Sequence, residues 1–150
     1  MSNLAAALAE SNPSYWDEAG QLYKHALDSI IATFGENHPS TAQTLNCIAN
    51  LAQRQGKPYE EIKSLYMRSL KVLRAIHGEN HPDVSLALND MALLSYTHGR
   101  LSEAEELYKK ALAVNMSVFG PTHPETKRAE QALNKFYQVT GSKPSSVKTE

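Results

Sequence analysis

Three histidines recur at matching positions along the chain, and the imidazole side chain is a common metal ligand. His38, His81 and His123 follow one another at intervals of 43 and 42 residues, and each precedes a proline. A zinc ion needs its ligands within about 2 Å, whereas packed helices of successive repeats lie about 8–10 Å apart. We therefore expect the histidines to pack in turns, and the sequence predicts neither a metal site nor a cofactor.

The other reactive side chains also favour structural roles. Tyr23, Tyr66 and Tyr108 keep the same interval and lie on apolar stripes, so core packing is expected of them. Cys47 has no histidine or other base beside it in the sequence and is expected to be a small buried residue. The sequence contains neither a glycine-rich phosphate loop nor a nucleophile elbow. These features predict that the protein is not an enzyme.

A row that mixes amides, cations and two aliphatic or aromatic side chains, at helical spacing opposite the apolar stripes, is the candidate binding surface. Amide side chains can hydrogen-bond a peptide backbone as donors and as acceptors, and cationic side chains can pair with carboxylates. The predicted partner is therefore a protein or an extended, acidic peptide. The candidate binding residues are Gln43, Asn46, Asn50, Arg54, Asn89, Leu93, Tyr96, Arg128, Gln131 and Lys135.

The elements that must position this row repeat along the chain. The pentapeptide Gly-Glu-Asn-His-Pro fills residues 35–39 and again 78–82, and it returns in altered form at residues 120–124. Between these motifs, apolar residues recur three and four positions apart, which predicts two amphipathic helices per unit. Gly56 and Gly99 fall between the paired helices, where glycine adopts a positive φ without steric cost. The proline after each histidine suits the first turn of a helix.

The repeated pattern resembles a known family. Ala19-x-x-x-Tyr23, Ile62-x-x-x-Tyr66 and Ala104-x-x-x-Tyr108 are similar to the tetratricopeptide signature. The longer unit of about 42 residues is similar to the kinesin light chain and nephrocystin type. This resemblance implies an all-α protein, a right-handed α-α superhelix of about seven antiparallel helices. It also implies that the first helix of each pair lines a concave groove for a cargo peptide, bordered by Asn46 and Asn89.

The register of the repeats predicts the organisation of an array over residues 1–141. A partial repeat covers about residues 3–37, and two full repeats cover about 38–80 and 81–122. A capping helix is predicted at about 124–140, since Glu130 and Asn134 replace the apolar residues of earlier repeats. Residues 142–150 are expected to be a disordered tail. The first helix begins part-way through its unit, so we expect the chain to be a fragment of a longer array.

Composition limits the classes of partner. The formal net charge of -1 gives no electrostatic reason to expect nucleic acid as a ligand. The sequence has no segment of membrane-spanning length and no secretory signal, and its single cysteine fits a reducing compartment, so a cytoplasmic location is expected. The leading function is a peptide-binding adaptor. The alternatives are a scaffold that self-associates through its N-terminal helix and a regulatory repeat domain of a larger multidomain protein.

Overall fold

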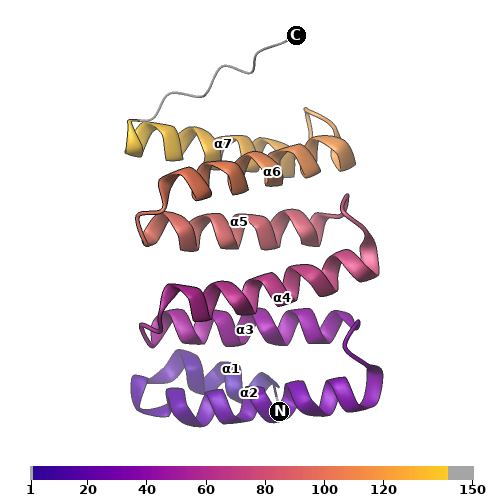
Figure 1. Ribbon diagram of the computed structural model, residues 1–150, viewed down its shortest axis with the longest axis vertical. Helices are drawn as coiled ribbons and strands as arrows, with labels where there is room; N and C mark the ends of the chain where they lie inside the picture. The colour runs from indigo at the N-terminus through magenta and orange to yellow at the C-terminus, as the bar shows by residue number, and fades with distance from the viewer. Residues whose placement is uncertain (1, 142–150) are drawn as a thin grey trace. The chain divides into compact units, whose positions relative to one another are not determined.

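The protein was analysed as a computed structural model that describes residues 2–141 (Figure 1). The described part contains seven α-helices and one short 3-10 helix, and no strand occurs in it. The predicted all-α class is therefore confirmed. The expected disordered tail at 142–150 lies outside the described residues. Among the helices of the described part, none is both long and apolar enough to cross a membrane.

The chain divides after Glu79 into two compact units. The first unit holds α1 (Ser2–Ser11), the 3-10 helix η1 (Pro13–Tyr15), α2 (Trp16–Phe34), α3 (Pro39–Arg54) and α4 (Tyr59–His77). Each of its α-helices packs against the next in chain order. The second unit holds α5 (Pro82–Thr97), α6 (Leu101–Phe119) and α7 (Pro124–Thr140). Within it, α6 packs against both α5 and α7, so α6 is the helix that the other two share as a neighbour.

The repeated histidines are the N-caps of the first helices in successive repeats. The Nδ1 atom of His38 accepts a hydrogen bond from the backbone N–H of Ser40 at 3.2 Å, and His123 accepts one from Glu125 at the same distance. Each proline then occupies the first helical turn, as predicted. Because Nδ1 accepts, the ring proton must reside on Nε2. The expected packing role is therefore a specific one, in which the ring replaces the usual serine or aspartate cap.

The glycines between paired helices have the predicted backbone conformation. Gly56 follows α3 with φ of 66°, and Gly99 follows α5 with φ of 71°. These values lie in the left-handed region, where a side chain at Cβ would be strained. The sharp turn brings the second helix of each pair back along the first, so that their apolar faces meet.

Small residues let the helices of each pair approach closely. In the first unit, the buried hydroxyl of Ser69 on α4 donates to the carbonyl of Ala42 on α3 at 3.1 Å. In the second unit, Ser85 on α5 donates to the carbonyl of Ala111 on α6 at 3.0 Å. Ser85 occupies the repeat position of Ala42, and Ala111 occupies that of Ser69. The same contact thus exists in both units, with the hydroxyl on opposite helices.

Candidate functional site

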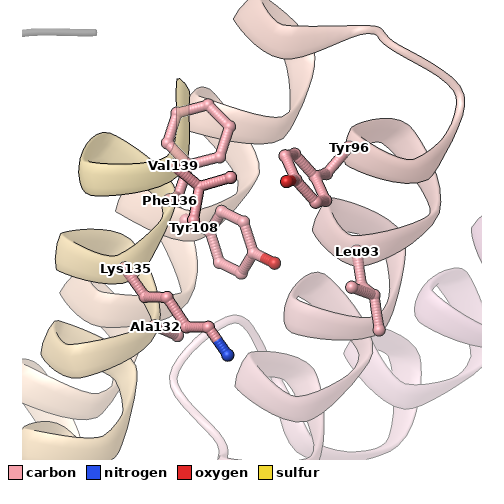
Figure 2. Close-up of a pocket in the computed structure, with 7 residues that line it drawn as sticks. All are labelled: Leu93, Tyr96, Tyr108, Ala132, Lys135, Phe136 and Val139. Atoms are coloured by element: carbon pink, nitrogen blue, oxygen red, sulfur yellow. The ribbon is translucent and has the colours of Figure 1, made fainter. Parts of the chain in front are cut away.

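The second unit contains an apolar pocket between α5 and α7, and α6 forms its floor (Figure 2). The pocket has a volume of about 220 Å³. We call it the Tyr108 pocket. Its lining residues are Leu93 and Tyr96 from α5, Tyr108 from α6, and Ala132, Lys135, Phe136 and Val139 from α7. Three of these, Leu93, Tyr96 and Lys135, belong to the predicted binding row.

Aromatic rings fix the shape of the Tyr108 pocket. The ring of Phe136 meets that of Tyr96 edge-on, with centroids 5.9 Å apart, and lies 5.7 Å from that of Tyr108. Burial, together with the nearby Tyr96, raises the pKa of Tyr108. Its hydroxyl therefore stays protonated at neutral pH and can donate a hydrogen bond. Figure 2 shows Tyr108 between the side chains that extend from α5 and those that extend from α7.

Lys135 supplies positive charge at the edge of the Tyr108 pocket. Its side chain is exposed, and no ion-pair partner for it occurs among residues 2–141. The other cation predicted on α7 is different, because Arg128 pairs with Glu125 at 2.5 Å. Gln131 is exposed on the same helix and does not line the pocket. Of the three predicted α7 residues, Lys135 is thus the one placed to pair with a carboxylate on a ligand in the pocket.

A smaller pocket lies toward the other end of α5 and α7. It has a volume of about 60 Å³, and the predicted residue Asn89 contributes to its lining. Its other lining residues are Pro82, Ser85, Leu86, Asn115, Phe119 and Glu125. Asn115 uses its amide to donate to the carbonyl of Glu125 at 3.2 Å, while the buried Oδ1 of Asn89 has no partner among the described residues. The sequence reasoning missed Leu86, which is 62% exposed beside Asn89.

The first unit contains a corresponding pocket of about 160 Å³, which we call the Tyr23 pocket. Its lining residues are Ala6, Ala9 and Glu10 from α1, Tyr23 from α2, and Cys47, Asn50, Leu51 and Arg54 from α3. The predicted residues Asn50 and Arg54 both lie here and both have partners within the unit. Asn50 accepts a hydrogen bond from the hydroxyl of Tyr66 at 2.5 Å, and Arg54 donates to the carbonyl of Ala9 at 3.1 Å.

Cys47 departs from the expectation that it is buried. It is half-buried and lines the Tyr23 pocket. Burial, followed by the neighbouring Cys47 and Glu10, raises the pKa of Tyr23 to about 12. The expectation was wrong because apolar periodicity identifies which face of a helix is buried, but not how far that burial extends. At the boundary of the buried face, exposure depends on how the neighbouring helices pack. Here the opening lies between α1 and α3.

The ten predicted residues fall into two groups. Asn50 and Arg54 meet in the first unit, where Gln43 is exposed farther along α3 and the Oδ1 of Asn46 is buried without a partner among the described residues. In the second unit, the Tyr108 pocket gathers three of them. The pocket residues absent from the prediction are Tyr108, Ala132, Phe136 and Val139. Tyr108, Ala132 and Phe136 are missing because helical periodicity marks them as core, and periodicity does not separate a packed position from one that lines a pocket. Val139 is 61% exposed and belonged to neither the predicted row nor the predicted core.

A repeat-based signal could have found them. Tyr108, Ala132, Lys135, Phe136 and Val139 each lie 85 residues after Tyr23, Cys47, Asn50, Leu51 and Arg54 respectively. The two pockets therefore occupy the same place in the repeat. Once one pocket is known, superimposing the repeats in sequence identifies the residues that line the other.

Comparison with known proteins agrees with this repeat. A model of the tetratricopeptide repeat family matches residues 40–117, which is more than half of the chain. The chain belongs to the tetratricopeptide repeat family. Tetratricopeptide repeats are in general scaffolds for protein–protein interaction, and the repeat and helical features expected from the sequence are in agreement with this family. A search of the curated proteins gave no match.

Two solved structures illustrate the tetratricopeptide fold of this chain. BtubC (BKLC) from P. vanneervenii has a TM-score of 0.73 and 22% identity, over 85% of this chain and 51% of that one. A putative kinesin light chain from Podosopora anserina, with nearly identical TPR-like repeats, has the same TM-score and 21% identity. That match covers 93% of this chain and 65% of the other. The chain thus spans between half and two thirds of the length of these tetratricopeptide proteins.

Proposed function

We propose that the protein is a non-enzymatic interaction module that binds a peptide segment of a partner protein at the Tyr108 pocket. The observation that carries this proposal is the Tyr108 pocket itself, an aromatic pocket of about 220 Å³ with the cationic side chain of Lys135 at its edge. The pocket suits one large apolar side chain, and burying such a side chain contributes about 1.5–3 kcal/mol. An acidic residue beside it on the ligand would pair with Lys135.

The remaining predicted residues offer contacts within their own units. In the second unit, Gln131 offers its amide group to a peptide backbone, and Asn89 offers its Nδ2 group because its Oδ1 is buried. In the first unit, Gln43 offers its amide group and Asn46 offers its Nδ2 group for the same reason. Arg54 and Arg128 already bind protein atoms, so a ligand would have to compete for them. We infer that Lys135 contributes more to the recognition of acidic peptides than either arginine does.

The cellular role that fits such a module is that of an adaptor resembling a kinesin light chain, acting in the cytoplasm. Its support is the likeness to the putative kinesin light chain described above and the tetratricopeptide repeat itself. The partner proposed on this basis is a protein with an exposed acidic segment.

The test is a titration of the full chain with an acidic peptide library, followed by backbone amide NMR shifts. Peptides that bind should shift the backbone amide resonances of Leu93, Tyr96 and Lys135. The substitution Lys135→Glu should lower the affinity for these peptides about tenfold, or by about 1.4 kcal/mol. Lys127→Glu is the matched control, because Lys127 is an exposed lysine on the same helix outside the pocket. Equal losses for both variants, or shifts that avoid the pocket, would contradict the proposal.

Self-association through α1 is the second candidate. It is favoured by Leu4, a large apolar residue of α1 that is 57% exposed. Sedimentation velocity over a range of concentrations tests it. A dimer that dissociates on Leu4→Glu would support this function, whereas a monomer at every concentration would exclude it.

A further inference from the structure

The equivalent faces of α3 and α5 differ in chemistry. The α3 row consists of Gln43, Asn46, Asn50 and Gln53, and the α5 row consists of Leu86, Asn89, Leu93 and Tyr96. Each member of one row lies 43 residues from its counterpart in the other. The α3 row is made entirely of amides. In the α5 row, Leu86 is 62% exposed and Leu93 is 50% exposed, so the second unit presents an apolar stripe where the first presents a polar one.

This difference affects which ligand backbone each row can accommodate. An extended peptide leaves its N–H and C=O groups without internal partners, and each group that is buried against an apolar surface must find a partner or incur a cost. The α3 row provides such partners at Gln43 and Gln53, whereas Asn50 already accepts a hydrogen bond from Tyr66 and the Oδ1 of Asn46 is buried. The α5 row has leucines at the positions of Gln43 and Asn50, and its only polar groups are the hydroxyl of Tyr96 and the amide of Asn89, whose Oδ1 is buried within the unit. A ligand whose backbone groups bond to one another is therefore the better match for the α5 row.

The spacing of the α5 row also matches a helix. Leu86 and Leu93 are seven residues apart, which is two turns or about 10.5 Å along α5. A ligand helix presents its own residues i, i+3, i+4 and i+7 at the same spacing, so that its ridge can pack beside the ridge of α5. Tyr96 continues the stripe into the Tyr108 pocket. The stretch from Pro82 to Tyr96 is about 21 Å long, enough for a helix of about 14 residues.

We propose that the α5 row and the Tyr108 pocket together bind an amphipathic helix of a partner protein, with an acidic side chain opposite Lys135. The proposal rests on the peptide-binding function above and specifies the conformation of the bound segment. The ammonium group of Lys135, which has no ion-pair partner within residues 2–141, sets the charge of the ligand flank, since Lys135 lines the pocket into which the stripe leads. The apolar face of the ligand helix covers Leu86 and Leu93.

The experiment selects binders from a phage-displayed library of random 16-residue peptides against the full chain. Each selected peptide is then synthesised and measured by fluorescence anisotropy against three variants. Leu86→Gln and Leu93→Asn convert the α5 row to the residues of the α3 row, and Leu101→Asn alters a leucine of 40% exposure outside both pockets. Circular dichroism verifies that the variants keep their helices. Every peptide is also remade with a central proline, which a bound helix does not tolerate.

The expected peptides carry apolar residues at intervals of three, four and seven, with acidic residues on one flank. Their affinity should fall at least tenfold for each row variant and on proline substitution, and it should not change for Leu101→Asn. Peptides that depend on the row but tolerate proline, or that carry apolar residues at every second position, would overturn the helical conformation alone. If no selected peptide depends on Leu86, Leu93 or the Tyr108 pocket, the proposed function fails as well.

Discussion

The Tyr23 pocket of the first unit and the Tyr108 pocket of the second occupy the same repeat positions but differ in content. In the first, the α3 side carries Cys47, Asn50 and Arg54, and the last two are bound to other atoms of the unit. In the second, the α7 side carries Lys135 at the position of Asn50 and Phe136 at that of Leu51, and Lys135 has no ion-pair partner in the described part of the chain. The repeat therefore determines where a pocket forms, and the residues at its edge determine whether their polar groups bond within the unit or remain available to a ligand.

The largest expected difference between the pockets is in their contribution to stability. Phe136 and Leu51 occupy one repeat position, and both are buried. Phe136→Ala should lower the free energy of unfolding by about 4 kcal/mol and Leu51→Ala by about 3 kcal/mol, because the larger side chain leaves the larger cavity. Urea denaturation followed by circular dichroism measures both. Val139→Ala is the control, since this residue is 61% exposed and should cost little. A greater loss for Leu51→Ala would show that the aromatic pocket is poorly packed.

A smaller difference is expected at the histidine caps. The ring of His123 stacks on Phe119 with centroids 4.2 Å apart, whereas that of His38 stacks at 4.6 Å on Phe34, which is 61% exposed. Loss of a cap costs about 1 kcal/mol, and the better stack adds to it. His123→Ala should therefore destabilise by about 1.5 kcal/mol and His38→Ala by about 1 kcal/mol.

The matched replacement for each cap is asparagine, which can accept the same backbone hydrogen bond. Thermal denaturation of the alanine and asparagine variants separates the cap from the ring stack. His123→Asn should recover most of the loss. If it is as unstable as His123→Ala, the ring stack rather than the hydrogen bond is the stabilising contact.

The smallest expected effects differ in sign between the units. The buried hydroxyl of Thr126 donates to the carbonyl of Gly120 at 2.7 Å, so Thr126→Val should cost about 1 kcal/mol. Thr41 occupies the same repeat position, but its buried hydroxyl has no partner among the described residues. Val84 fills this position in the intervening repeat. Thr41→Val should therefore stabilise by up to about 1 kcal/mol. A loss of stability for Thr41→Val, measured by the same denaturation, would mean that this hydroxyl has a partner such as water.

The sequence was sufficient to predict features that are local or that repeat. Gly56 and Gly99 were expected to make the turns between paired helices, and their positive φ values confirm this. The place of the prolines followed from the missing N–H of proline, and the all-α class followed from the apolar periodicity. These features depend on residues within a few positions of one another, so the local sequence is enough to predict them.

Features that depend on contacts between distant residues could not be predicted in this way. Arg54 was expected to be available for a ligand, but it donates to the carbonyl of Ala9, 45 residues away. Tyr108 and Phe136 carry the apolar signature of a core, although one side of each lines a pocket. Whether an apolar residue is covered depends on the helix opposite it, and no periodicity within its own helix records that information.

The reciprocal serines described above limit how such repeats can be recombined. If α3 were joined to a copy of α6, Ala42 would face Ala111 and the contact would contain no hydroxyl. If α5 were joined to a copy of α4, Ser85 would face Ser69 in a space that accommodates one hydroxyl group. The two helices of each pair are therefore complementary to one another at this contact and not to the helices of the other pair. Hybrid repeats built by exchanging whole pairs should retain this contact, whereas those built by exchanging single helices would lose it, and protein engineers can use the pair as the unit of exchange.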